Sequence, residues 1–272
     1  LAERFSNVLD RIQQESGGAI PNWQSSHPDP GEREQTIRQL AAEWESKANM
    51  TIVNRDEMLA HLAGVIFGEN PRNGYVQNST FLHPELRFQF DVPRGYQVVN
   101  EASRVIVVEP NGGAYAIMTL SNQPAAQQAR AFAQQEGVQI ADSGTDRVNG
   151  LTAAYVLANA QTQQGVLSVL FYAIEYAGNT YEFTGITTQQ GYSTYGRDFQ
   201  TLIQSFRPLT DSRVLNVQPA RVDLVSVQRA TPFQQLVPKS LPRDITALDL
   251  AIANQVELNE TIPAGTRVKL LQ

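Results

Sequence analysis

The sequence contains no cysteine among its 272 residues. That absence excludes disulfides, iron–sulfur clusters, thiolate zinc sites and cysteine nucleophiles. It leaves the compartment open, because reducing and oxidising compartments both tolerate a chain without thiols. Histidine is scarce as well, and none of His27, His61 and His83 lies in an HExxH motif. A zinc protease of that type needs two imidazoles four residues apart on a helix, so this chain cannot build such a site alone.

An excess of positive charge is also missing. The chain has 21 basic and 27 acidic residues, a net charge of −6 and a pI near 5.2. Its arginines are scattered singly, so the basic stripe expected of a nucleic-acid binder is absent. The longest apolar stretch, residues 166–174, is far shorter than the ~20 residues that span a bilayer. We therefore expect neither a nucleic-acid partner nor a transmembrane segment in this sequence.

Motifs for catalysis are lacking too. The sequence has no G-x-S-x-G and no Walker loop, and Gly112-Gly113 follows Asn111 as a hairpin turn. Glu57 and His61 have i, i+4 spacing and could share a metal, but an ordinary pair on a helix surface is favoured. His83 precedes a proline and is interpreted as a turn residue. We predict no catalytic or metal-ligating residue in this chain.

Helical periodicity characterises the first part of the sequence. Residues 1–14 and 33–47 each place apolar side chains at helical spacing. Asn54 with Glu57 three residues later predicts the start of another helix. The stretch GENPRNG at residues 68–74 is a turn cluster and marks the first expected domain boundary.

The middle of the chain alternates with the period of β-strands. Short strands are expected from Phe81 onward, followed by a helix at residues 124–136 and a second strand set at 138–187. A helix at residues 192–206 closes the region. The order of sheet, helix, sheet, helix predicts the α+β class, with a mostly antiparallel sheet forming a sandwich domain over residues 75–208.

The aromatic residues of the predicted strands could fill a core or line a ligand cavity, and the core is favoured. This group is Phe81, Phe88, Phe90, Tyr96, Phe171, Tyr172, Tyr181 and Phe183. The apolar run at residues 170–176 is expected to be a central strand rather than an edge strand.

A small βααβ unit is predicted for residues 219–272, after a polar linker at 208–219. Its elements are a strand at 221–227, a helix with Pro232 at the first helical position, a helix at 246–254 and a strand at 265–270. Residues 1–67 form the helical N-terminal segment of this three-part division.

Three stretches resemble segments of bacterial zinc metalloproteases of the HtpX and CAAX-prenyl-protease type. The sequence SHPDP at residues 26–30, followed by Arg33, is similar to the T-H-P-x-x-x-x-R segment after their active site. Residues 68–96 resemble the segment after their protease domain, G-x-x-P-R-x-G … F-x-H-P-x-L-x-F … P-x-G-W, with Tyr96 in place of Trp. Residues 219–271 resemble their degenerate LysM-like tail, with Asn254 at the position of a typical asparagine.

This resemblance implies a parent zinc endopeptidase whose HExxH motif and third ligand lie before Leu1. Zinc is then a cofactor of the parent catalytic domain, and this chain holds none. The segment 1–67 would contain the last helices of that domain and a linker. His27 would lie in a loop near the cleft, where it could approach the metal, and a capped loop histidine is the alternative. Arg33 would pair with a carboxylate of the protease body.

The resemblance also implies a function. The middle region is similar to a PsbP-like sandwich used for binding, so we expect an accessory region for substrate positioning or envelope docking, periplasmic or outer-membrane-associated. Its partners would be the parent protease domain, unfolded or envelope proteins and, through the LysM-like tail, peptidoglycan. The alternative is a stand-alone envelope binding module with a glycan or lipoprotein partner. A hydrolase with an unrecognised site is a third hypothesis.

Overall fold

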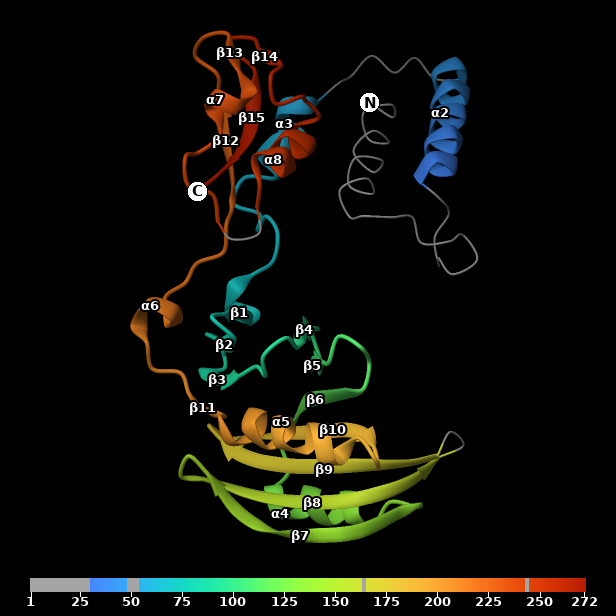
Figure 1. Cartoon of the computed structure of the whole chain (residues 1–272). Helices are drawn as coiled ribbons and strands as arrows, with labels where there is room; N and C mark the ends of the chain where they lie inside the picture. The colour runs from blue at the N-terminus through green and yellow to red at the C-terminus, as the bar shows by residue number, and fades with distance from the viewer. Residues whose placement is uncertain (1–29, 48–53, 163–164, 243–244) are drawn as a thin grey trace. The chain divides into compact units, whose positions relative to one another are not determined.

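The computed structural model describes residues 30–47, 54–162, 165–242 and 245–272 (Figure 1). The chain divides into two compact units. The central unit is Pro71–Gln218, and the terminal unit unites the residues up to Asn70 with Pro219–Gln272. The helix predicted at residues 1–14 lies outside the described residues. No helix of the described part is both long and apolar enough to cross a bilayer.

Two helices precede the central unit in the chain. Helix α2 (Pro30–Lys47) confirms the helix predicted at residues 33–47. Helix α3 (Arg55–Ala60) begins after Asn54 but is shorter than its apolar periodicity indicated. The Asn54 side chain does not cap the backbone; its amide donates to the Glu57 carboxylate at 2.8 Å. The helix starts where predicted, but the Asn54 side chain forms no N-cap hydrogen bond.

The terminal unit has the predicted βααβ order. Its main strands, β12 (Val222–Ser226) and β15 (Arg267–Leu271), pair antiparallel, and its helices are α7 (Phe233–Leu236) and α8 (Ala247–Asn254). Its core consists of Val227, Phe233, Leu250, Ala251, Ile262, Val268 and Leu270. Pro232 was predicted to be the first residue of a helix; it instead immediately precedes α7. Thr231–Pro232 forms the short strand β13, which pairs with β14 (Thr261–Ile262).

Residues before the central unit complete the terminal unit. The backbone N–H groups of Gly64 and Phe67 donate to the carbonyls of Val222 and Ala220, each at 2.8 Å. Val222 returns a bond to the carbonyl of Val65 at 2.8 Å, and Ile66 bridges Arg221. This pairing supplies partners for the start of the β12 edge that does not face β15, at Val222, so residues 64–67 fold with the C-terminal residues.

The Asn254 side chain supplies hydrogen-bond partners for backbone groups on the opposite edge of the strand pair, on β15. Its side-chain oxygen accepts from Lys269 N, and its amide donates to Lys269 O, both at 2.7 Å. The same amide also donates to Leu250 O within α8 at 2.8 Å. The side chain thus replaces a missing strand neighbour and ties the last residue of α8 to the middle of β15.

The central unit contains two antiparallel sheets. The four-stranded sheet has the order β1 (Tyr75–Gln77), β2 (Thr80–His83), β3 (Phe88–Asp91) and β11 (Arg207–Pro208). The seven-stranded sheet has the order β4 (Gln97–Asn100), β5 (Val105–Val108), β6 (Ala114–Ser121), β10 (Asn179–Thr188), β9 (Gly165–Tyr176), β8 (Leu151–Thr162) and β7 (Val138–Val148). The α+β class is confirmed, and β9 is the central strand that the run at 170–176 predicted.

One helix packs on each face of the seven-stranded sheet. Helix α5 (Tyr192–Gln204) covers the face that carries Tyr181 and Phe183, and helix α4 (Ala125–Ala133) covers the other face over β7, β8 and β9. Gly185 lets α5 approach closely, because a Cβ at this position would lie 2.6 Å from the Phe199 ring. Seven of the eight strand aromatics predicted for the core are buried, and Tyr96 is half-buried.

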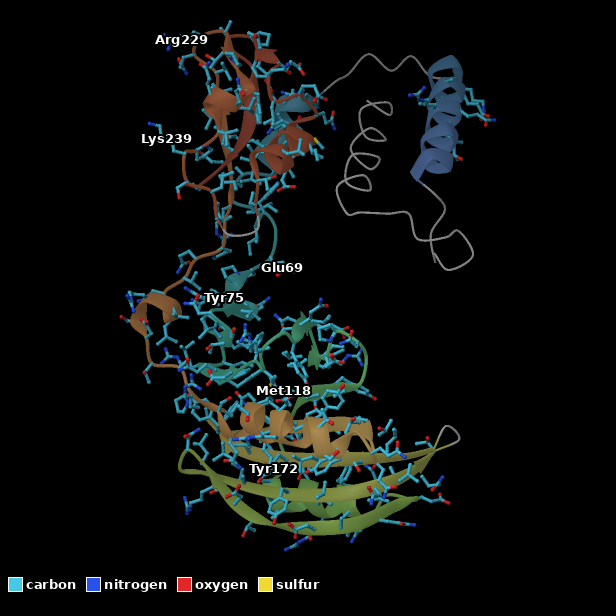
Figure 2. All side chains as sticks on the ribbon, in the orientation of Figure 1. Glu69, Tyr75, Met118, Tyr172, Arg229 and Lys239 are labelled. Atoms are coloured by element: carbon cyan, nitrogen blue, oxygen red, sulfur yellow. The ribbon has the colours of Figure 1, made fainter. Side chains whose placement is uncertain are left out.

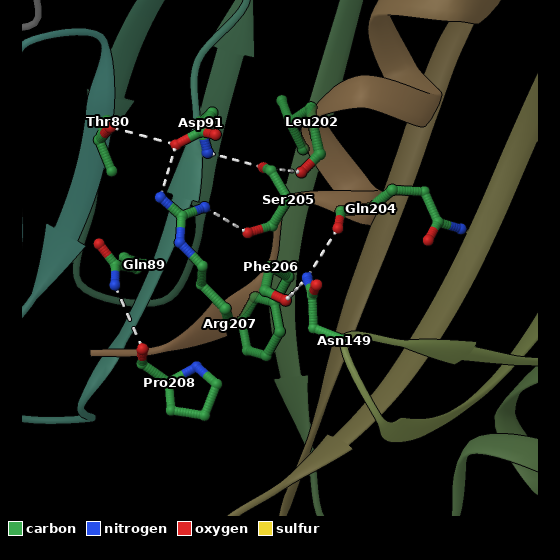
Figure 3. Close-up of polar contacts among 10 residues, drawn as sticks. All are labelled: Thr80, Gln89, Asp91, Asn149, Leu202, Gln204, Ser205, Phe206, Arg207 and Pro208. Atoms are coloured by element: carbon green, nitrogen blue, oxygen red, sulfur yellow. Dashed lines mark hydrogen bonds and ion pairs between the residues drawn. The ribbon is translucent and has the colours of Figure 1, made fainter. Parts of the chain in front are cut away.

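The end of α5 is bonded to the four-stranded sheet (Figure 3). Arg207 forms an ion pair with Asp91 at 2.9 Å and donates to the carbonyl of Ser205. Asp91 also accepts from the Thr80 hydroxyl, and its N–H donates to the Ser205 hydroxyl. Pro208 was expected to begin a linker, but Arg207–Pro208 form β11, because this network and β3 supply partners for their polar groups. The short helix α6 (Ser212–Leu215) lies within the remainder of the expected linker.

Replacing Asn254 by alanine tests its role in the terminal unit. The change leaves the backbone N–H and C=O of Lys269 without this partner, so we expect a loss of about 2 kcal/mol in the free energy of unfolding. Urea unfolding followed by circular dichroism measures it. Asn259→Ala is the matched control, because Asn259 is exposed. Equal midpoints for the two variants would show that the bonds to β15 contribute nothing.

Candidate functional site

The residues expected near a protease cleft are His27 and Arg33. His27 lies outside the described residues, and Arg33 lies in the first half of α2. Their proposed place beside a protease cleft stays a prediction. Within the described ranges, no group of three or more histidine, aspartate or glutamate side chains could hold a metal ion. The Glu57 carboxylate, considered above as a metal ligand together with His61, accepts a hydrogen bond from the Asn54 amide.

His83 is a structural residue at the end of β2. Its Nδ1 accepts from the backbone N–H of Leu86 at 3.1 Å, and its ring stacks on Phe88 with centroids 5.1 Å apart. Burial lowers its pKa to about 4, so the imidazole is neutral at pH 7. His83 is thus the last residue of β2 rather than a turn residue as predicted, and its neutral ring bonds Leu86 in the turn that follows.

The most unusual surface of the central unit is one half of the seven-stranded sheet, which we call the open face. Cross-strand partners point to the same side of a sheet, so the strand register places its residues in two rows. The first row is Val99, Ile106, Ile117 and Thr184, and the second is Gln97, Val108, Tyr115 and Ile186. Both rows cross β4, β5, β6 and β10.

Helix α4 ends the open face on one side. The next residues in the two rows are Phe171 and Val169 on β9, and both are buried. Phe132 of α4 stacks on Phe171, with ring centroids 4.8 Å apart and planes at 5°. In the part of the chain that the structure describes, α4 packs on β7, β8 and β9, and no helix packs extensively on the rows across β4, β5 and β6.

The open face is apolar and accessible. Val99 is 47% exposed and Tyr115 is 37% exposed, while Ile106, Val108, Ile117 and Ile186 are half-buried. Neither row contains a charged side chain. A contiguous apolar surface of this kind commonly marks an interaction site in soluble proteins.

Glu182 stands at the border between the open face and α4. It lies on β10 opposite Thr119 and Ala173, and its Oε2 accepts a long hydrogen bond from the Thr119 hydroxyl at 3.4 Å. Its Oε1 is buried and has no hydrogen-bond partner. Burial raises the pKa of this carboxyl, and this effect is larger than the lowering of the pKa by hydrogen bonds from the Thr119 and Ser121 hydroxyls.

A shallow pocket lies at the start of α4. Residues 122–124 and 175–180 line this space of about 330 Å³. The Glu175 carboxylate accepts from Ala125 N at 2.9 Å, and it thereby caps the first turn of α4 from β9. The Thr180 hydroxyl donates to Gln123 O at 2.6 Å. These polar groups bond one another, so the pocket is a structural junction and the open face is the candidate binding surface.

The sequence carried a signal for this face that its strand pattern alone did not identify. Residues 105–108 read VIVV and 114–118 read AYAIM, so both strands are apolar at successive positions. Such runs are typical of strands that are buried on both faces. The structure covers one face of β5 and β6 with the α5 side of the core, and the second apolar face is the open face.

Comparison with known proteins finds a distant likeness in architecture. No protein-family model and no curated protein matches the chain. Cyanobacterial PsbP of Synechocystis aligns with 50% of this chain and 96% of its own, at 16% identity and a TM-score of 0.40. LpqN, involved in cell envelope biogenesis of Mycobacterium tuberculosis, aligns with 45% of this chain and 83% of its own, at 11% identity and a TM-score of 0.38. The yeast Ran-binding protein Mog1p covers 52% and 99%, at 10% identity and a TM-score of 0.35. These values assign no function.

Glu182→Gln tests the unpartnered carboxylate beside the open face. The raised pKa means that the folded state holds a proton more tightly than the unfolded chain, so Glu182 costs stability as the pH rises above about 4.5. We expect the variant to be more stable at pH 7 by about 1 kcal/mol, or ~2–4 °C in Tm, and the gain to vanish near pH 4. Thermal melts across this range measure it.

Glu136→Gln is the control, because Glu136 is an exposed carboxylate outside this region. A Glu182→Gln variant that melts at or below the wild-type temperature at pH 7 would show that Glu182 has a stabilising partner.

Proposed function

We propose that this chain is a non-catalytic binding region, and that the open face of its central unit docks extended, apolar polypeptide segments. The observation that carries the proposal is the pair of uncharged rows across β4, β5, β6 and β10. Because β5 and β6 are apolar on both faces, their second face has the composition of a buried surface while lying at the molecular surface. An apolar segment exposed in an unfolded protein has the complementary chemistry.

We propose further that the region serves a bacterial zinc metalloendopeptidase of the HtpX and CAAX-prenyl-protease type, in the periplasm or at the outer membrane. The resemblance of residues 26–33, 68–96 and 219–271 to that family supports this assignment. The parent protease domain, with its zinc, would then perform catalysis, and the open face would hold unfolded or envelope protein substrates beside it. Sequencing upstream of Leu1 is expected to show HExxH followed by a glutamate on a second helix; an unrelated upstream domain would contradict it.

Binding of a permanently unfolded protein tests the open face. Reduced, carboxymethylated α-lactalbumin is the probe, and fluorescence anisotropy of the labelled probe gives the affinity of the full chain. Val99→Thr with Tyr115→Thr places β-branched residues, which favour strands, at both positions and removes apolar surface. We expect the double variant to bind about tenfold more weakly, which corresponds to ~1.4 kcal/mol.

The matched control is Leu120→Thr. Leu120 lies on β6, as Tyr115 does, and is 45% exposed, but its cross-strand partner is Tyr181 on the face of α5. Equal loss of affinity in Leu120→Thr and in the double variant would reject the open face as the binding surface. An absence of binding by the wild-type chain would reject the proposal itself.

The isolated chain is expected to lack peptidase activity and stoichiometric zinc. The physical reason is that HExxH is absent from the sequence and that the described residues contain no metal-binding group of three side chains. Casein digestion and metal analysis of the purified chain measure the two quantities. Cleavage of casein together with one zinc per chain would contradict the accessory role and would favour a hydrolase with a site of its own.

The alternative function, a stand-alone module that binds envelope glycan, depends on the terminal unit. Its βααβ order supports a LysM-like tail, whereas residues 229–233 read RATPF where a LysM usually reads G-D-T-l. The short strands β13 and β14 of this unit pair with each other. Retention of the chain on insoluble peptidoglycan would favour this alternative, and failure to sediment with it leaves the docking function as proposed.

A further inference from the structure

Three cationic residues of the terminal unit, Arg55, Arg267 and Lys269, lie on or beside β15. Arg267 and Lys269 are two residues apart in this strand, so they point to the same side of it. Arg55, the first residue of α3, reaches the strand from a distant part of the sequence and donates from its guanidinium to Arg267 O at 3.3 Å. The fold thus brings together cations that lie 212 residues apart in the chain.

This cluster contains more positive charge than its neighbours neutralise. Asp56 lies 3.7 Å from the Arg55 guanidinium, in a side chain that is 71% exposed. Asp223 is opposite Leu270 in the strand pair and hence on the other side, whereas the partner of Lys269 is the apolar Leu224. Within the described ranges, the ammonium of Lys269 and the guanidinium of Arg267 form no ion pair. Burial and the nearby charge of Arg55 both lower the pKa of Lys269.

Holding a half-buried ammonium next to a guanidinium costs folding free energy. Groups whose pKa is perturbed by burial and by a like charge cluster at functional sites, and a ligand of opposite charge would offset this cost. The backbone beneath is well fixed, because Asn254 bonds both the N–H and the C=O of Lys269. The cations are therefore presented from a rigid strand, and an anion placed between them would remove the repulsion.

We propose that Arg55, Arg267 and Lys269 form a binding site for a phosphate group. Two guanidinium groups offer paired N–H donors that match the oxygens of phosphate, and the ammonium adds a point charge. A doubly charged phosphate suits three cations, of which Asp56 offsets one. The phosphate could belong to a soluble phosphate monoester or to the headgroup of an anionic lipid, and both would contact the same side chains.

The first test titrates the full chain with inorganic phosphate at constant ionic strength, with chloride as the reference anion. We expect saturable shifts in the amide resonances of residues 267–269, together with a rise in Tm that chloride does not produce. Arg267→Gln and Lys269→Met are each expected to weaken phosphate binding at least tenfold. The matched controls are Arg229→Gln and Lys239→Gln, which remove exposed cations elsewhere in the same unit (Figure 2).

Stability without phosphate distinguishes a binding role from a purely structural one. Lys269→Met removes the repulsion with Arg55 and keeps the apolar stem, so the variant should be at least as stable as the wild-type chain while no longer responding to phosphate. A variant that is less stable, with its phosphate response intact, would overturn the proposal. So would equal affinities in the cluster variants and in the two controls, or a wild-type chain that responds to phosphate and chloride alike.

Vesicles identify the source of the phosphate group. Phosphatidylglycerol vesicles that retain the wild-type chain but not Arg267→Gln, with phosphatidylcholine vesicles as reference, would assign the site to a lipid headgroup. Saturable binding of inorganic phosphate without retention on either vesicle would assign it to a soluble phosphate. Both results support the site, and they are independent of the open face, because binding of unfolded protein is measured separately.

Discussion

The aromatic packing around Phe206 is the interaction on which the central unit depends. Phe206 follows α5 and is fully buried; its ring lies 5.4 Å from Phe88 of the four-stranded sheet and 4.9 Å from Tyr181 of the seven-stranded sheet. One side chain therefore joins both sheets and the end of the helix. The ion pair of Arg207 and Asp91 and the hydroxyl of Ser205 surround this contact with polar bonds, which fix the direction in which the chain leaves α5.

The same packing explains why the seven-stranded sheet has two unlike faces. Alternate residues of β10 contribute Tyr181 and Phe183 to the core, and Gly185 lets the Phe199 ring lie directly on the strand. With α5 on that side and the short α4 over β7, β8 and β9 on the other, half of the second face has no helix packed extensively on it among the described residues. A sheet that is apolar on both sides but covered on one is the physical basis of the proposed binding function.

The main sheet of the terminal unit has only two strands, β12 and β15, and needs further contacts to be stable. Two strands alone leave two edges of unpaired backbone groups, and such a pair is only marginally stable. Here residues 64–67 pair with one edge and the Asn254 side chain bonds the other. Residues 64–67 follow α3 closely in the chain, so their pairing with the C-terminal residues holds α3 near β15. Arg55 at the start of α3 then bonds the carbonyl of Arg267. The charge cluster is thus a consequence of how the small sheet is completed.

Periodicity in the sequence determined the elements whose two sides differ. The α+β class, the central position of β9, helices α2 and α5 and the βααβ order of the terminal unit all follow from apolar spacing, because burial of one side imposes that spacing. Apolar spacing did not indicate the length of strand β7, which extends to Val148, because it is an exposed edge strand held by backbone hydrogen bonds that require no apolar pattern. Tertiary structure alone decided that Arg55 bonds the carbonyl of Arg267, that residues 64–67 pair with β12 and that one face of β5 and β6 stays open. Each of these depends on contacts between distant segments, which the local sequence does not encode.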